Sequence, residues 1–303
     1  MPATKNTAAI LTLLAGATVW GLIWYPYRVL EHAGVSAATA AALTYFAAFL
    51  FGLIFLRRSL AELRPSLRPG SGRAWQLALL ALAAGGCNLG YVLATVHGEV
   101  MRVLLLFYLA PLWTVLLARL LLDERLSGAG AAVIALSLAG AAVMLWQPRL
   151  GLPLPENGAE WMGLAAGFLF ALTNVLIRRT AHLSIELKSM AVFAGVVAVG
   201  LCVLPLESAP LALPRRPLDW ALVLAVGAVL LVINLVVQYG LTRTPANQAV
   251  VIFLFELVVA ALSSWLLAGE AMGAKEWLGG AMIVAASLFS GRMEASRQPD
   301  RIQ

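Results

Sequence analysis

The chain alternates between long apolar stretches and short polar segments from one end to the other. A helix needs about 20 mostly apolar residues to cross the hydrocarbon core of a membrane. Because lipid offers no partner for backbone N–H and C=O groups, apolar stretches of this length form helices. We therefore predict an all-α integral membrane protein with ten transmembrane helices, at residues 8–30, 35–56, 74–95, 99–121, 128–146, 161–177, 186–205, 219–240, 248–267 and 276–291.

The composition supports a membrane protein and argues against a nucleic-acid partner. Hydrophobic residues make up 61% of the 303 residues, charged residues only 12%, and the mean hydropathy is +0.88. The net charge of +6 comes from basic residues that lie mostly between the apolar stretches, as the positive-inside rule requires, so it needs no polyanion. Cys87 and Cys202 fall inside apolar stretches and have no metal-binding spacing. We expect membrane lipid as the surrounding partner, and neither a metal nor a cofactor.

The distribution of basic residues orients the helices. If the N-terminus is cytoplasmic, fifteen Lys and Arg residues fall on the cytoplasmic side and five on the opposite side. Cytoplasmic segments of membrane proteins carry this excess of positive charge. We therefore place both termini in the cytoplasm. The predominance of Arg over Lys, with much Ala and Leu, favours the cytoplasmic (inner) membrane of a bacterium as the location.

The two halves of the sequence resemble each other. Residues 20–28 and 170–178 each hold an aromatic residue, a small residue, a Leu and a closing Arg. Five helices are an odd number, so a second half of five enters the membrane with inverted topology. We therefore predict two inverted five-helix repeats, 1–150 and 151–303. Three further pairs of residues stand in nearly the same register: Asn88 with Asn234, Phe107 with Phe253, and Glu124 with Glu270.

Several short motifs resemble those of the drug/metabolite transporter superfamily, and more narrowly its EamA-type permeases. They are Trp20-Gly21, the run Leu109-Ala110-Pro111 and the helix exit 122–126. The resemblance covers essentially the whole chain and implies a secondary transporter of small metabolites, with export of amino acids or similar amphipathic solutes as the typical activity. The second half departs from the pattern, since Leu257 stands opposite Pro111 and is preceded by Glu256.

Glu256 is the acidic residue that lies deepest in an apolar stretch, about 12 Å from the inner end of its helix. A charge at this depth is costly and usually faces a partner or a cavity. One interpretation is a proton-coupling residue or a counter-charge for a substrate amine. The other is a structural carboxyl group that is protonated or hydrogen bonded.

Arg102 also lies within a predicted helix, but close to its outer end and near His97 and Glu99. Its long side chain could extend to the membrane interface. Alternatively, its guanidinium could hold a substrate carboxylate through two parallel hydrogen bonds. The sequence leaves both interpretations open.

Helical spacing groups further polar and aromatic residues on shared helix faces. Polar groups inside a membrane usually turn toward the protein interior, so these faces could line a central cavity for an amphipathic solute. Helix–helix packing with an interhelical hydrogen bond is the alternative for each face. With Arg102, the predicted substrate-binding residues are Trp20, Trp24, Tyr27, Asn88, Tyr91, Phe107, Tyr108, Trp113, Phe170, Asn174, Asn234 and Gln238.

Three other functional classes are less consistent with the sequence. It has no nucleotide-binding loop and no signature of a metalloprotease or serine hydrolase, so we expect a protein that is not an enzyme. A scaffold would not need buried polar residues, and a channel would show a polar stripe through the whole bilayer. A membrane protein without transport activity, either a scaffold or a membrane enzyme, remains the alternative. The small residues of 128–146 and 276–291 suit packing within the chain or between the subunits of a homodimer.

Overall fold

A computed structural model describes residues 3–57, 73–148, 154–203, 213–269 and 271–291, which form helices and no strands. The helices of the first half are α1 (Ala3–Leu22), α2 (Trp24–His32), α3 (Ala37–Phe55), α5 (Arg73–His97), α6 (Val100–Phe107), α7 (Ala110–Leu122) and α8 (Gly128–Leu145). Those of the second half are α9 (Gly158–Arg179), α10 (Ile185–Val203), α11 (Pro217–Arg243), α12 (Ala246–Phe253), α13 (Phe255–Ser263), the π-helix η4 (Ser264–Ala268) and α14 (Ala274–Phe289).

Each expected span coincides with one helix or with consecutive helices separated by a short break. Eight of these segments are long and apolar enough to cross a membrane. Helix α3 is a shorter apolar helix, and α14 has 16 residues. The all-helical membrane architecture is thus confirmed, whereas the exact count of ten spans stays a prediction.

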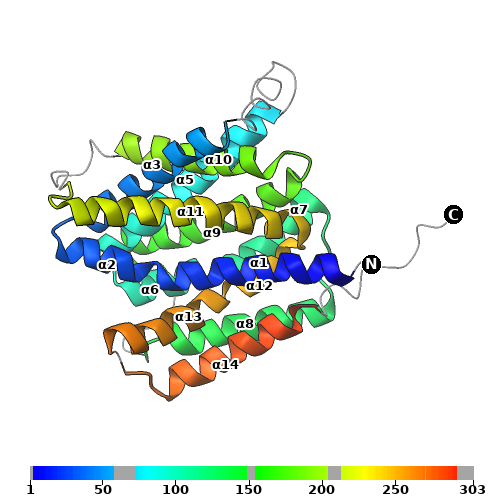
Figure 1. Cartoon of the computed structure of the whole chain (residues 1–303). Helices are drawn as coiled ribbons and strands as arrows, with labels where there is room; N and C mark the ends of the chain where they lie inside the picture. The colour runs from blue at the N-terminus through cyan, green and yellow to red at the C-terminus, as the bar shows by residue number, and fades with distance from the viewer. Residues whose placement is uncertain (1–2, 58–72, 149–153, 204–212, 270, 292–303) are drawn as a thin grey trace.

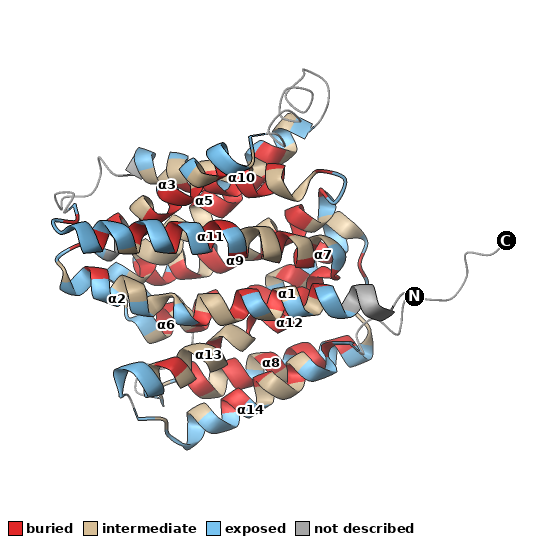
Figure 2. Cartoon of the chain, in the orientation of Figure 1, coloured by how far each residue is buried: buried red, intermediate tan, exposed pale blue. Residues whose placement is uncertain are grey.

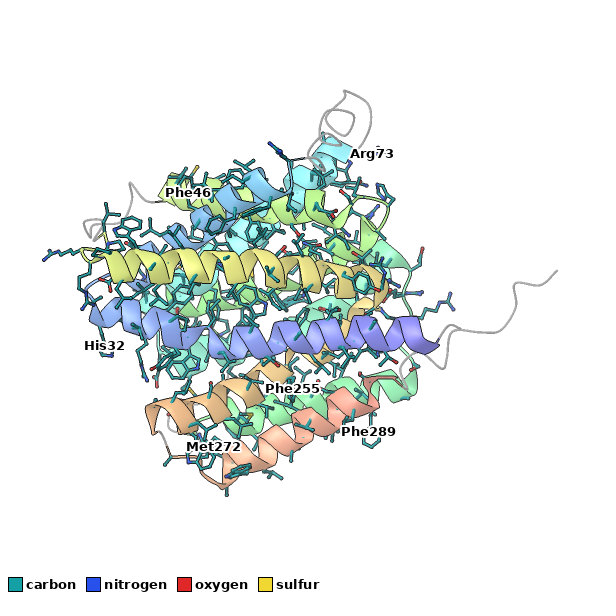
Figure 3. All side chains as sticks on the ribbon, in the orientation of Figure 1. His32, Phe46, Arg73, Phe255, Met272 and Phe289 are labelled. Carbon is teal, nitrogen blue, oxygen red and sulfur yellow. The ribbon has the colours of Figure 1, made fainter. Side chains whose placement is uncertain are left out.

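The helices lie side by side in one bundle (Figure 1). Helix α1 begins, and α14 ends, at the same end of this bundle, which we call the inner end. Arg73 and Phe289 lie toward the inner end, His32 lies at the opposite, outer end, and Phe255 lies between them (Figure 3). Buried residues face neighbouring helices and exposed residues face outward, as Figure 2 shows for α11 and α14. The exposed residues include many large apolar side chains, as expected of a lipid-facing surface.

Two membrane-crossing segments are broken at equivalent positions. Helix α6 ends at Phe107 and α12 ends at Phe253, the two residues that the sequence places in register. Pro111 explains the first break, because proline has no N–H to donate to the carbonyl four residues earlier. The second break has no proline, and there the backbone N–H of Leu257 bonds to the carbonyl of Leu254. A break at this position therefore does not require a proline.

The two halves are interleaved. Helix α1 packs on α11, α12 and α13 of the second half, and α9 packs on α5, α6 and α7 of the first. Likewise α3 packs on α11, α10 packs on α5, and α8 packs on α14. The contacts of α1 and α9, and those of α3 and α10, are counterparts in which the roles of the halves are exchanged, whereas α8 and α14 are equivalent helices that pack on each other. This pattern agrees with a duplicated architecture whose interior lies between the repeats.

Glycines permit two of these close contacts. A Cβ atom at Gly140 of α8 would overlap the carbonyl oxygen of Gly279 in α14, and a Cβ atom at Gly279 would overlap that of Gly140. A Cβ atom at Gly195 of α10 would overlap the carbonyl of Ala81 in α5. Small residues allow helix backbones to approach this closely within a membrane. The prediction that α8 and α14 are packing helices is confirmed within the chain.

Candidate functional site

The two broken segments meet through a hydrogen bond between the halves. Tyr108 directly follows α6, and Glu256 is the second residue of α13, so each side chain lies at its break. The Tyr108 hydroxyl donates to Oε1 of Glu256. Tyr108 is 9% exposed and packs in one apolar cluster with Leu254 and Leu257. We call this meeting point the central junction. Through this bond the carboxyl group of Glu256, a half-buried residue, faces the partner half.

Aromatic rings from four helices surround the central junction. Centroid separations are 5.1 Å for Tyr91 and Phe107, 5.2 Å for Phe107 and Tyr108, 5.5 Å for Phe107 and Phe170, and 5.7 Å for Phe170 and Phe253. These are ordinary separations for edge-to-face and tilted pairs. We call these five residues the aromatic cluster. Sequence reasoning predicted four of them for the site; it noted Phe253 only for its register.

The aromatic residues of the first membrane segment diverge toward different neighbours. Trp24 donates its indole N–H to Oγ of Ser263 in α13 over 2.9 Å. The Tyr27 hydroxyl lies 2.9 Å from Oγ1 of Thr44 in α3. Trp20 packs against a cluster that contains Tyr45. Residues that share this helix face therefore contact different helices: Trp24 contacts α13 and Tyr27 contacts α3. The Trp24 hydrogen bond joins α2 to the second half near the outer end.

Asn88 and Trp113 also lie outside the aromatic cluster. Asn88 interacts with the hydroxyl group of Tyr45, which brings α5 against α3. Trp113 makes an edge-to-face contact with Phe168 of α9 at 5.5 Å, and its buried indole N–H has no partner among the described residues. These two residues hold the helices around the site, and a direct role of either in binding stays a prediction.

Three predicted amide residues from α9 and α11 have buried side-chain atoms that are incompletely bonded, although Asn234 as a residue is only half-buried. Asn174 is 5% exposed and Gln238 is 1% exposed. Nδ2 of Asn174, Oδ1 of Asn234 and both amide atoms of Gln238 have no hydrogen-bond partner in the described structure. An unmade hydrogen bond at a buried polar group costs about 1–3 kcal/mol. In folded proteins, water or a ligand commonly supplies the missing hydrogen-bond partner of such a group.

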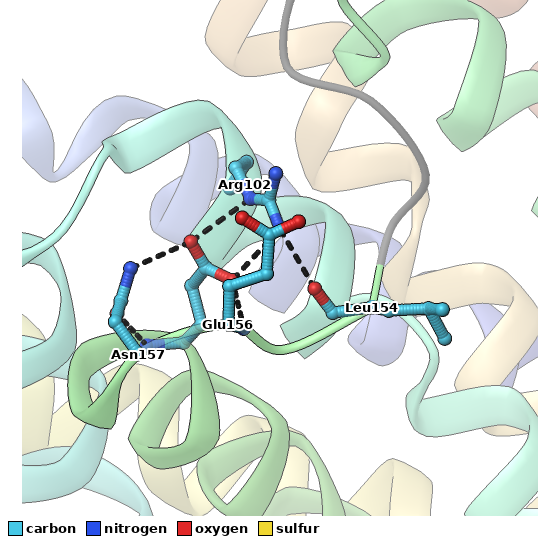
Figure 4. A network of polar contacts seen from close by, with 5 residues as sticks. Arg102, Leu154, Glu156 and Asn157 are labelled. Atoms are coloured by element: carbon cyan, nitrogen blue, oxygen red, sulfur yellow. Dashed lines mark hydrogen bonds and ion pairs between the residues drawn. The ribbon is translucent and has the colours of Figure 1, made fainter.

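Arg102 forms a buried ion pair near the outer end (Figure 4). Its Nε and one terminal nitrogen each lie 2.9 Å from a carboxylate oxygen of Glu160, and the same nitrogen donates to the Leu154 carbonyl at 2.7 Å. Glu156 lies 3.3 Å from this nitrogen. Arg102 is only 8% exposed, so its guanidinium is enclosed by protein at the outer end, and the interpretation that it extends to the membrane interface stays untested. Its guanidinium is held by acidic residues of this chain, and a role toward a substrate carboxylate is untested.

A second polar network lies at the inner end. Glu124 accepts the backbone N–H of Ala246 at 3.0 Å and lies 3.5 Å from Nε of Arg178. Arg178 donates to the carbonyl of Thr242 at 2.8 Å, and the fully buried Lys188 donates to Oγ1 of Thr242 at 2.5 Å. This network joins the ends of α7, α9 and α11 to the start of α12.

Sequence reasoning noted Glu124 for its register with Glu270. The Glu124 carboxylate accepts the backbone N–H of Ala246, the first residue of α12. Its repeat counterpart Glu270 lies outside the described residues. Lys188 was counted only as a basic residue of the cytoplasmic side, although a lysine three residues into the apolar helix α10 was a signal that it needed polar partners.

Comparisons with known proteins agree with this architecture. Residues 7–146 and 157–292 each match the model of the EamA-like transporter family. The chain is 30% identical over 272 residues to a riboflavin transporter of Rhizobium johnstonii, covering 86% of this chain and 83% of that protein. It also resembles a protein of known crystal structure with a TM-score of 0.75 at 21% identity, over 95% of this chain and 98% of the other. The latter likeness concerns the fold alone.

Proposed function

The chain belongs to the EamA-like transporter family, and from this membership we propose that it is a secondary transporter that works by alternating access. That it is a membrane transporter of small metabolites follows from the family and from the relative named as a transporter. The proposal adds that the two repeats are inverted and that the substrate binds at the central junction between them. We further propose export across a bacterial cytoplasmic membrane, with both termini in the cytoplasm.

The single observation that carries this mechanism is the hydrogen bond between Tyr108 and Glu256. It joins the halves where each has a broken segment, and a break lets the helical pieces on its two sides tilt independently. Substrate sites of transporters with inverted repeats lie at such discontinuous helices, near the middle of the bilayer. Rocking of the halves about this point would expose the site first to one side and then to the other.

Glu256 is the proposed proton-coupling residue. Among the described residues it is the carboxyl group that lies at a break, where it accepts a hydrogen bond from Tyr108 of the other half. Loss of the proton creates a charge whose favoured partners are the Tyr108 hydroxyl, water or a substrate amine. Proton binding and substrate binding would then bias the same equilibrium between conformations.

The substrate is proposed to be a small amphipathic solute. The aromatic cluster provides apolar ring faces, while Glu256 and the amides of α9 and α11 provide polar contacts. The family resemblance suggests amino acids, and the relative is named for riboflavin. Both have an apolar part and hydrogen-bonding groups, as such a site requires.

Counterflow in proteoliposomes tests the transport mechanism. Vesicles containing the purified protein are loaded with an unlabelled amino acid, nucleoside, organic cation or riboflavin, and entry of the labelled solute is measured. A carrier accumulates the label transiently, because it exchanges one solute molecule for another, whereas a channel or a scaffold does not. Absence of counterflow with every solute would support the alternative of a membrane protein without transport activity.

Glu256→Gln tests the coupling. Gln mimics the protonated carboxyl group, so this variant should retain counterflow and lose accumulation driven by a pH gradient. Glu31→Gln, which changes an exposed carboxyl group of α2, is the control and should behave as wild type. Wild-type accumulation by Glu256→Gln at several pH values would remove the coupling role.

A further inference from the structure

The incompletely bonded amides of Asn174, Asn234 and Gln238 indicate what kind of substrate the site accepts. Together they leave a donor on α9, and a donor and two acceptors on α11, without a partner in the described structure. Asn174 and Gln238 are both more than nine-tenths buried, so bulk solvent does not satisfy them. Whatever completes these bonds must itself be polar and must enter between the helices.

The helices that carry these amides pack beside the aromatic cluster. Phe170 precedes Asn174 by one helical turn on the same face of α9. Ile233 and Val237, the neighbours of Asn234 and Gln238 in α11, belong to the same apolar cluster as Phe253, and Phe170 packs against that cluster. A solute whose flat face lies on the rings would therefore present its edge toward the amides.

The chemistry of the amides favours an uncharged edge. An amide side chain offers one acceptor and a pair of donors, and it pairs well with the adjacent donor and acceptor atoms of a heterocycle. A free amino acid instead carries a carboxylate, which is best held by an arginine fork. Arg102 is bound to Glu160 at the outer end, and Lys188 is bound to Thr242 and the carbonyl of Ile177 at the inner end.

We propose that the transported solute is an uncharged planar heterocycle with an imide or amide edge. Its ring lies against Phe107, Phe170 and Phe253, and its edge bonds to Asn174 and Gln238, with Asn234 completing the set. This inference rests on the proposed function and narrows its substrate class, from amphipathic solutes in general to neutral ring systems with adjacent N–H and C=O groups.

Binding to the purified protein, measured separately from transport, tests the substrate class. Riboflavin is the probe, because its ring carries an imide edge and its fluorescence reports binding. N3-methylriboflavin lacks the imide N–H, and tryptophan has an aromatic ring with a zwitterionic end. We expect wild-type protein to bind riboflavin about tenfold or more tightly than either compound, the ratio expected for one lost hydrogen bond to a buried group.

Gln238→Leu and Asn174→Leu replace each amide by an apolar side chain. Each should weaken riboflavin binding by about tenfold, while N3-methylriboflavin should be affected less. Thermal stability should not fall, because each change replaces an unpaired polar group by an apolar one. Gln76→Leu, near the start of α5, is the control and should leave binding unchanged.

Three results would overturn this inference: no riboflavin binding by wild type, tighter binding of tryptophan than of riboflavin, or unchanged riboflavin binding by both Leu variants. The last result would mean that the amides hold only water. Counterflow distinguishes these failures from failure of the proposed function. If the protein exchanges tryptophan in counterflow, the proposed transport mechanism stands and only the proposed substrate class is refuted.

Discussion

The ion pair between Arg102 and Glu160 offers a quantitative test of how the halves are joined. Arg102 belongs to α6 of the first half, and Glu160 lies in the first turn of α9 in the second. Their side chains are only 10% and 4% exposed. Glu160 also accepts the backbone N–H of Glu156 and the side-chain amide of Asn157, each at 2.8 Å. We propose to replace each partner singly, as Arg102→Met and Glu160→Met, and then both together.

The magnitude follows from the burial. Removing one partner of a buried ion pair leaves the other charge uncompensated and costs about 3–5 kcal/mol. Replacing both partners by apolar residues of similar volume is often neutral or stabilising. The double variant should therefore be more stable than either single variant. Glu156→Gln is the control, because the Glu156 side chain is 68% exposed. Its loss should cost about 0–1 kcal/mol, as for a surface pair.

Thermal unfolding of the purified protein in detergent measures these differences. A loss of 3 kcal/mol corresponds to a fall in Tm on the order of 10 °C, if the scaling for soluble proteins of 150–250 residues applies. The four proteins form a double-mutant cycle, and the difference between the double variant and the sum of the singles gives the coupling energy. Additive effects, or a coupling no larger than that of a surface pair, would refute the assignment of a buried link between the halves.

Two further predictions concern packing and specificity. Gly195→Ala should destabilise the protein by about 1–3 kcal/mol, because the added methyl group overlaps the Ala81 carbonyl. Gly200→Ala, which meets open space on the same helix, should be neutral or stabilise by up to about 1 kcal/mol in the same unfolding assay. Trp20→Ala and Asn88→Ala should each change relative counterflow rates among solutes more than they change protein yield. Loss of yield alone would assign these two residues to packing.

The membrane environment explains why the sequence predicted most of the helices. Apolar length and backbone satisfaction determine where helices lie, so the helices appear where the hydropathy places them. The register of Phe107 with Phe253 even marked the ends of α6 and α12. The break after Phe253 was not predicted, because no proline or glycine stands there. It depends on packing between the halves, which local sequence does not encode.

The site was predicted less completely, and for a related reason. Helical spacing shows which residues share a face, but it does not show which neighbour that face meets. Trp24 and Tyr27 share a face, yet they contact different helices. Arg102 lay near the acidic Glu99 in sequence, but its partner Glu160 is 58 residues away. Such pairings depend on the tertiary arrangement, whereas Glu256 could be singled out because a carboxyl group at that depth is rare.

The interleaved contacts have a consequence for biogenesis. Helix α5 rests on α9 and α10, and α1 rests on α11, α12 and α13, all of which leave the ribosome later. Until then, the glycine-lined surface of α5 at Gly85, which α10 covers in the finished bundle, has no helix of the second half to meet. Assembly therefore depends on late-made segments, and a nascent chain stopped near residue 150 would lack most of the contacts that hold its helices in place.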